Sequence, residues 1–126
     1  MRLSLSTVCL DCHDAHAMAE FYGGLLGWEA TIAEPDWVLM RDPAGGTGLS
    51  FQAEPAYVEP VWPERPDAQQ KMLHLELRVS PATHAALQEA VERALAAGGR
   101  LAEHQFRDDL RVVLDPSGHP FCLFLD

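Results

Sequence analysis

The chain has 126 residues, of which 48% are apolar, and this is enough for one globular domain with a sizeable core. The formal net charge of −10 argues against nucleic acid and membrane surfaces as partners, because both attract basic patches. A neutral or cationic small molecule remains open as a ligand. The N-terminal residues make a poor secretory signal, and no apolar run reaches membrane-spanning length. The three cysteines form no disulfide framework, which predicts a cytoplasmic protein.

The first half of the chain predicts one helix among four strands. Residues 3–12 alternate in polarity as a strand does. Asp14 is a plausible N-cap for a helix that runs to about Leu26, and Gly27 ends it. Further strands are expected at 28–33, 36–41 and 47–53.

The second half repeats this order after a proline-rich connector at 54–70. Residues 72–79 predict a strand with one aliphatic face and one polar face. Ser80 or Thr83 could cap a helix over 81–97, which Gly98 and Gly99 end. Strands are expected at 100–106, 110–115 and 120–125.

One turn motif occurs in both halves of the chain, each time between two apolar runs. In an Asp-Pro-x-Gly turn, proline presets one turn dihedral and glycine supplies the positive one. Two hairpins of one design indicate an internal duplication, with module one at about 3–53 and module two at about 71–126. The two copies are Asp42-Pro43-Ala44-Gly45 and Asp115-Pro116-Ser117-Gly118.

The order of one strand, one helix and three strands, repeated in both halves, and three segments of the chain resemble the vicinal oxygen chelate superfamily. This superfamily includes glyoxalase I, extradiol dioxygenases and bleomycin-resistance proteins. The resemblance narrows to its glyoxalase-like branch. It implies an α+β fold in which two tandem βαβββ modules form a curved mixed sheet around a central cavity, within a single domain over residues 1–126 and in a homodimer. The segments are Trp62-Pro63, Gln70-Lys71-Met72-Leu73-His74-Leu75-Glu76-Leu77 and Asp115-Pro116-Ser117-Gly118-His119-Pro120-Phe121-Cys122-Leu123.

Metal-dependent members of the superfamily carry four ligands on the first and last strands of the modules, and their residues are His, Gln or Glu. The matching positions here are Thr7, Ser50, His74 and Cys122, with Gln52 as the alternative to Ser50. One imidazole, two hydroxyls and a thiol lack the carboxylates that hard metals need and the donors that soft metals prefer. We therefore expect neither the usual metal nor a cofactor.

His74 admits two interpretations. It is either a structural histidine bonded to a neighbour, or a general base in the cavity whose basicity is raised by Glu76 on the same strand face. Because the opposite face is aliphatic and packs under a helix, His74 and Glu76 must face the cavity or solvent. The resemblance favours the cavity, with His74 and Glu76 as catalytic residues.

The expected function is that of a glyoxalase-like protein that acts on, or binds, a small organic molecule. An enzyme would be a lyase or an isomerase with His74 as its acid and base. A bleomycin-resistance-like protein that sequesters an antibiotic would need only a shaped cavity. Tryptophans at 37 and 62 would suit a flat aromatic ligand, or a cationic one given the acidic charge. The expected ligand-binding residues are Thr7, Cys9, Trp37, Ser50, Gln52, His74, Cys122 and Phe124.

Overall fold

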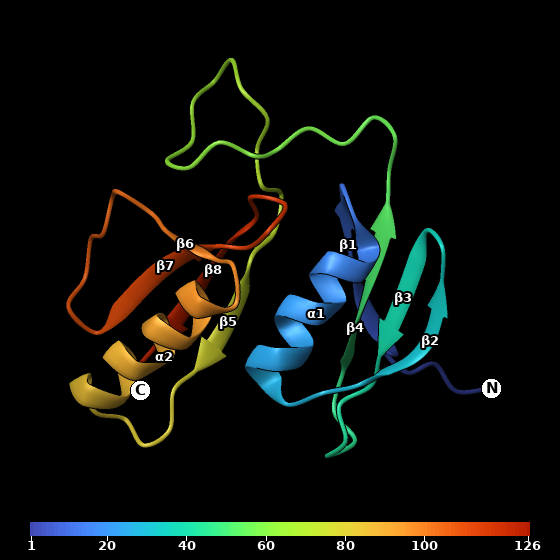
Figure 1. Cartoon of the computed structure of the whole chain (residues 1–126), viewed down its shortest axis with the longest axis horizontal. Coiled ribbons are helices and arrows are strands. Elements are labelled where there is room, and N and C mark those ends of the chain that lie inside the picture. The colour runs from blue at the N-terminus through green and yellow to red at the C-terminus, as the bar shows by residue number, and fades with distance from the viewer. The chain divides into compact units, whose positions relative to one another are not determined.

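A computed structural model describes all residues from 1 to 126. The chain divides into two compact units, Met1–Tyr57 and Val58–Asp126, and the boundary lies inside the predicted connector. Each unit has the order strand, helix and three strands, as Figure 1 shows. The first unit contains β1 (Thr7–Cys12), α1 (Ala15–Leu26), β2 (Ala30–Glu34), β3 (Trp37–Met40) and β4 (Gly48–Ala53).

The second unit repeats the arrangement of the first. Its sheet has the strand order β5-β8-β7-β6, and that of the first unit has β1-β4-β3-β2. In each sheet the first and fourth strands of the unit pair in parallel and the remaining pairs are antiparallel. The predicted α+β fold is thus confirmed, with one four-stranded mixed sheet in each unit. The elements are β5 (Leu75–Arg78), α2 (His84–Ala96), β6 (Arg100–Leu101), β7 (Leu110–Leu114) and β8 (Pro120–Phe124).

The ends of both helices follow from local chemistry. The Asp14 carboxylate accepts hydrogen bonds from two backbone N–H groups of the first turn of α1, and Gly27 ends the helix at φ 74°. Thr83, rather than Ser80, caps α2 by accepting from Ala86 N at 3.1 Å. As a result α2 begins at His84, three residues later than the sequence predicts.

The apolar stripes of the helices form the two cores. In α1 the predicted Met18, Phe21 and Tyr22 are buried, and the Tyr22 ring stacks on Phe51 of β4 with centroids 5.7 Å apart. In α2 the buried residues are Leu87, Val91 and Ala94. The apolar spacing of the sequence also predicts Leu95 in this stripe, and this prediction is wrong, because the Leu95 side chain is exposed in the last turn of the helix.

Several predicted strands are shorter in the structure. Residues 3–6 and 72–74 precede β1 and β5 instead of belonging to them. Met72 has a positive φ of 64° and an exposed side chain, so the extended conformation begins only after it. Leu73 is exposed as well, and the aliphatic face of this segment is therefore shorter than predicted.

The strand predicted at 100–106 is reduced to β6, Arg100–Leu101. The amide of the Gln105 side chain takes the place of a strand partner, because it accepts from Val112 N at 2.9 Å and donates to Val112 O at 2.9 Å. It also donates to Ala102 O at 2.8 Å. A side chain thus satisfies the backbone groups of β7 where a longer β6 would have done so.

Both Asp-Pro-x-Gly segments form turns between the third and fourth strands of their units. The Asp42 carboxylate accepts from Ala44 N at 2.8 Å, and the Asp115 carboxylate accepts from Ser117 N at 2.9 Å. The final glycines have φ of 88° and 82°. The two turns hold equivalent topological positions, as the duplication predicts.

Neither helix of the structure is long and apolar enough to cross a membrane.

Candidate ligand cavity

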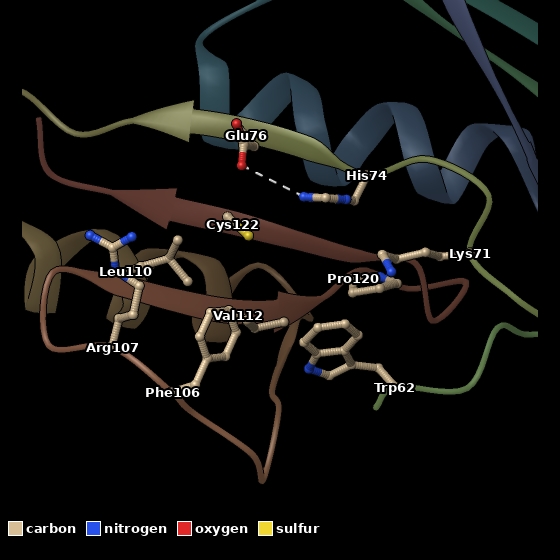
Figure 2. A pocket seen from close by; sticks show the side chains of 10 residues that line it. All are labelled: Trp62, Lys71, His74, Glu76, Phe106, Arg107, Leu110, Val112, Pro120 and Cys122. Carbon is tan, nitrogen blue, oxygen red and sulfur yellow. Dashed lines mark ion pairs between the residues drawn. The ribbon is translucent and has the colours of Figure 1, made fainter. Parts of the chain in front are cut away.

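The second unit contains a cavity of about 270 Å³ on the face of its sheet opposite α2. Figure 2 shows side chains around it from the connector, from the start of β5, from the loop between β6 and β7, and from strands β7 and β8. This volume lies just below the ordinary range of ligand pockets, which begins at about 300 Å³. The lining residues are Trp62, Lys71, His74, Glu76, Phe106, Arg107, Leu110, Val112, Pro120 and Cys122.

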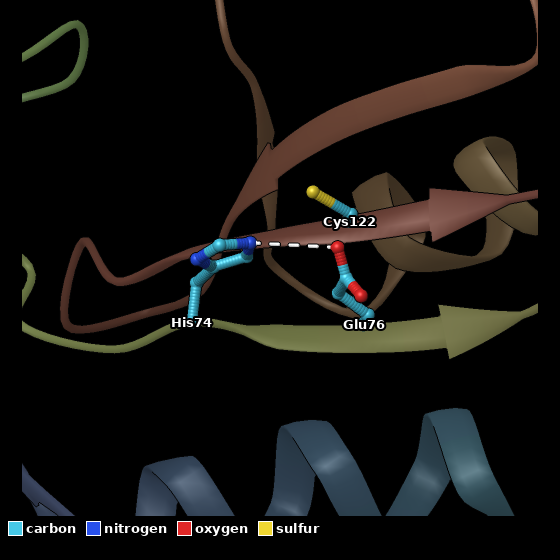
Figure 3. A group of neighbouring side chains, drawn as sticks. All are labelled: His74, Glu76 and Cys122. Carbon is cyan, nitrogen blue, oxygen red and sulfur yellow. Dashed lines mark ion pairs between the residues drawn. The ribbon is translucent and has the colours of Figure 1, made fainter.

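Strand register brings the three chemically reactive side chains together. Glu76 lies opposite Cys122 in the parallel pairing of β5 with β8. His74 precedes Glu76 by two residues and therefore points to the same face. Figure 3 shows the three side chains converging on one region above the two strands. Their potential donor atoms all lie within 4.8 Å of one another.

The contact between His74 and Glu76 is electrostatic. His74 Nε2 lies 3.6 Å from Glu76 Oε1, which is an ion pair when the imidazole is protonated but is too long for a hydrogen bond. The two side chains are 37% and 60% exposed, so water reaches both and screens their attraction. The pair can move a proton at the cavity wall without being held rigidly.

The Cys122 thiol resists ionisation. Burial raises its pKa first of all, the negative charge of Glu76 raises it further, and the positive charge of Lys71 opposes both effects. A protonated thiol is a weak nucleophile. The environment of Cys122 therefore favours a packing role over covalent catalysis.

A cation and two aromatic rings form the other end of the cavity. Lys71 Nζ lies 4.9 Å from the centroid of the Trp62 ring and forms an ion pair with Glu64. The rings of Trp62 and Phe106 have centroids 6.2 Å apart and are tilted by 51°. Trp62 also packs against the small core cluster of the second unit, which fixes one face of the cavity.

The loop between β6 and β7 supplies Phe106 and Arg107 to the cavity wall. Arg107 forms a two-bond ion pair with Asp109, at 2.8 and 2.7 Å. Arg111 Nη1 donates to three carbonyl oxygens of this segment, those of Arg107, Asp108 and Leu110. Together with Gln105, these bonds hold an irregular segment in one conformation.

The structure places the predicted residues of the first unit on its own sheet. Thr7 Oγ1 lies 3.0 Å from Ser50 Oγ, which is a hydrogen bond between β1 and β4. Cys9 is exposed and lies opposite Ser50 in register. Gln52 donates to Glu54 at 2.8 Å, and Trp37 lies opposite Gln52 on β3.

In the second unit three of the predicted residues, His74, Glu76 and Cys122, share the cavity wall. Phe124 does not line it, and instead its ring lies 5.5 Å from the Arg78 guanidinium. Phe124 stands two residues beyond Cys122 on the same strand face, at the far end of β8. The distance along the strand separates it from the cavity.

The four positions that match the metal ligands of the superfamily do not form a fitting donor set. The hydroxyls of Thr7 and Ser50 bond to each other, and a neutral hydroxyl is not a usual ligand of a protein-bound metal. His74, Glu76 and Cys122 offer three donors of different kinds, and they are the one group of residues in the chain whose spacing could hold a metal ion. Because one imidazole, one carboxylate and one thiol match neither the oxygen donors of hard metals nor the donor sets of soft metals, we derive no chemistry through a metal.

Sequence reasoning missed most of the cavity wall. The strand predicted at 100–106 includes Phe106, which lies instead in the loop that follows β6. Lys71 belongs to a segment that carries the family resemblance. The sequence feature that could have pointed to it is that it is the one lysine in the chain. The other missed residues are Arg107, Leu110, Val112 and Pro120.

A family model described as a glyoxalase-like domain matches residues 7–124. The chain belongs to this family. The match covers both units, and the predicted resemblance to the vicinal oxygen chelate superfamily is thereby confirmed. No curated protein sequence matches the chain.

Solved structures share the fold of this glyoxalase-like domain. A glyoxalase/bleomycin resistance protein/dioxygenase family enzyme from Burkholderia phytofirmans PsJN is 24% identical, with a TM-score of 0.71 and coverage of 96% of this chain and 97% of the other. A glyoxalase-related enzyme from Fulvimarina pelagi is 20% identical, with a TM-score of 0.69 and coverage of 98% and 88%. A glyoxalase/bleomycin resistance protein from Albidiferax ferrireducens T118 is also 20% identical, with a TM-score of 0.64 and coverage of 94% and 95%. At these identities the likeness establishes the fold.

Proposed function

We propose that this glyoxalase-like protein binds a small, flat organic molecule in the cavity of the second unit and that His74 and Glu76 act on it as a catalytic pair. One observation carries the proposal: an imidazole and a carboxylate 3.6 Å apart share a wall with Trp62 and Phe106. A cavity that combines aromatic walls with a few convergent polar groups is the usual form of a small-molecule site.

The chemistry that this wall supports is proton transfer. His74 is accessible from the cavity, so its ring can accept a proton from an acidic C–H or O–H of the ligand. The Glu76 carboxylate stabilises the imidazolium that results, because opposite charges at this distance attract. Such a step belongs to a lyase or an isomerase. It proceeds without the usual four-ligand metal of the superfamily and without a cofactor.

The proposal extends to the first unit and to the assembly. Thr7, Cys9, Ser50 and Gln52 stay predicted ligand-binding residues on the sheet of the first unit, as the resemblance implies for the first and last strands of module one, and Trp37 stays one as an aromatic residue of the same sheet. Phe124 is left out of this set, because it does not line the cavity. The protein would work in the cytoplasm as a homodimer, with no nucleic acid or membrane as partner, in keeping with the net charge of −10.

A second candidate function is ligand sequestration without catalysis, as in bleomycin-resistance proteins. The raised pKa of Cys122 favours this alternative, because it removes the thiolate that could have served as a second reactive group beside His74. The cavity would then need only its shape and its aromatic wall. Turnover of a bound ligand distinguishes the two functions.

The experiment screens small organic molecules by thermal shift, with and without added divalent metals, and then compares wild type with His74→Gln. Saturating ligand at a hundredfold excess over Kd raises stability by about 2.7 kcal/mol. We expect His74→Gln to change affinity or turnover about tenfold while the free energy of unfolding stays within about 0.5 kcal/mol of the wild type. Metal analysis of the dialysed protein should find no stoichiometric Zn, Ni, Fe or Mn.

His84→Gln is the matched control, because His84 is exposed at the start of α2 and lies outside the cavity. It should leave affinity, turnover and stability unchanged. A loss of several kcal/mol of stability in His74→Gln with unchanged ligand affinity would identify His74 as a structural histidine. One metal per chain that is lost in His74→Gln would contradict the metal-free proposal.

A further inference from the structure

The charges on the cavity wall differ in sign from those of the whole chain. The chain carries 19 acidic and 9 basic residues, yet two of the three formally charged lining residues, Lys71 and Arg107, are cations. Glu76 is the one carboxylate among the lining residues. Their acidic partners, Glu64 and Asp109, do not line the cavity. Two cations and one carboxylate give the lining a formal charge of +1, against −10 for the whole chain.

Lys71 is the most unusual of these residues. It is the one lysine of the chain, and its side chain is only 14% exposed. Glu64, its ion-pair partner, is 47% exposed and so lies on the solvent side. The ammonium group has three N–H donors, of which one Glu64 oxygen takes one. The partly buried charge has donors left for an acceptor in the cavity.

A second donor in the wall of the cavity has no acceptor. The indole Nε1 of Trp62 is buried and makes no hydrogen bond. Buried polar groups in proteins are nearly always hydrogen-bonded, so an orphan indole N–H beside a cavity indicates a missing acceptor. Figure 2 shows this nitrogen on the edge of the ring that faces Phe106, while the Lys71 ammonium lies over the ring.

The remaining wall is flat and apolar. Phe106 is 51% exposed although it is a large aromatic residue, and its ring centroid lies 6.2 Å from that of Trp62. Leu110 and Val112 of β7 add apolar side chains to the same wall. Exposed aromatic rings beside a cavity favour a planar partner, because stacking and edge contacts add to the burial of apolar area. With a volume of about 270 Å³ the cavity accepts one or two fused rings.

We propose that the ligand of this cavity is a planar aromatic carboxylate, with its ring against Trp62 and Phe106 and its carboxylate on Lys71, while the Trp62 indole N–H on the edge that faces Phe106 is left for a second acceptor atom of the ligand. This inference rests on the proposed function and names its ligand class. It selects an anion over the cation that the acidic composition leaves open, because the local wall, and not the net charge, faces the ligand. Arg107 provides a second positive charge across the cavity.

The test compares three probes of one shape and different charge: 2-naphthoate, 2-naphthamide and 2-naphthylmethylammonium. Affinities come from calorimetric titration of the full chain, and the site comes from ¹³C reductive methylation. Reductive methylation labels lysine side chains and the N-terminal amine. Because Lys71 is the one lysine, the spectrum contains two labelled groups, and the dimethylamino signal of Lys71 has only the N-terminal signal beside it. We expect naphthoate to bind at least tenfold more tightly than the other two probes and to shift the Lys71 signal.

Two variants with opposite expected effects on naphthoate affinity test the role of Lys71. Lys71→Met should weaken naphthoate binding about tenfold or more and leave naphthamide binding nearly unchanged, because one charge-assisted hydrogen bond is lost. Glu64→Gln should tighten naphthoate binding, since it removes the carboxylate that competes for the ammonium while Lys71 stays in place. The second variant keeps the inference testable where Lys71→Met destabilises the fold.

Arg107→Gln and Arg100→Gln form a matched pair. Both arginines are exposed, at 59% and 64% of their side chains, and each has one acidic partner, but Arg107 lines the cavity and Arg100 pairs with Glu59 elsewhere. Arg107→Gln should weaken naphthoate binding, and Arg100→Gln should not. An equal loss in both variants would show a nonspecific charge effect and would overturn the inference.

The remaining outcomes separate this inference from the proposed function. If the three probes bind equally and His74→Gln weakens all of them, the cavity binds ligands but the preference for an anion is wrong. If the ammonium probe binds best, the inference is overturned in favour of a cation. If no probe binds and the screen finds unrelated ligands that depend on His74, the proposed function survives and the aromatic carboxylate does not.

Discussion

Cys122 illustrates at the residue scale how a buried thiol responds to its neighbours. Its pKa is raised mainly by burial and further by Glu76, which lies opposite it on β5. The folded state therefore prefers the protonated thiol. Because the thiol of the unfolded chain ionises at lower pH, the contribution of Cys122 to stability is complete below the ordinary thiol pKa and declines as pH rises above it.

Removal of the carboxylate should make this thiol more acidic. We expect Glu76→Gln to lower the pKa of Cys122 but to leave it above the ordinary value, because burial is the larger cause and remains. The measurement is the rate of alkylation by iodoacetamide as a function of pH, resolved for each cysteine by mass spectrometry. Glu92→Gln on α2 is the control. An unchanged midpoint in Glu76→Gln would show that the two groups do not interact.

The element that matters most for the cavity is the irregular segment between β6 and β7. It carries Phe106 and Arg107, and three hydrogen bonds of the Gln105 side chain join it to the backbone of Ala102 and Val112. A loop that supplies binding residues needs such support, because its own backbone has no ladder of hydrogen bonds.

Gln105→Ala should therefore destabilise the protein by about 2 kcal/mol, since it removes these bonds and leaves the N–H of Val112 without an acceptor. Chemical denaturation measures the change. The matched control is Gln88→Ala, which removes a single exposed contact with Glu92 on α2 and should cost less than about 0.5 kcal/mol. Equal effects in the two variants would show that Gln105 does not support the segment. Affinity for 2-naphthoate should fall as well in Gln105→Ala, because Phe106 loses its fixed position.

At the scale of the whole molecule, the duplication is exact in topology but not in environment. Both units place an Asp-Pro-x-Gly turn between their third and fourth strands. Asp115 is fully buried, and one of its carboxylate oxygens accepts from the N–H groups of Ser117 and His119. Asp42 lies nearer to solvent and its carboxylate accepts from Ala44.

The two turns should consequently respond differently to the same substitution. We expect Asp115→Ala to cost about 3 kcal/mol and Asp42→Ala about 1 kcal/mol, because unmade hydrogen bonds are more costly where water cannot replace them. Thermal or chemical unfolding of the two variants gives the comparison. Asp115→Asn, which retains an acceptor oxygen, should recover part of the loss. Equal costs for the two alanine variants would show that the turns are equivalent in energy as well as in position.

The sequence by itself determined the elements whose signals are local. A carboxylate at Asp14, a glycine at Gly27 and the alternation along β5 act within a few residues, so the helix ends, the strand faces and the duplicated order could be predicted. The shared face of His74 and Glu76 follows from the same alternation.

Only the tertiary structure decided which residues surround the cavity. Trp62 and Lys71 lie in the segment between β4 and β5, and Phe106 lies in the loop between β6 and β7. Neither segment has regular secondary structure, and no periodicity places such residues in space. The short β6 also depends on a tertiary contact. The alternation at 100–106 predicts a longer strand, but the Gln105 side chain hydrogen-bonds the backbone of Val112 on β7 in place of a strand partner. Contacts between distant segments depend on packing and on which partner satisfies each backbone group, and a local pattern contains neither.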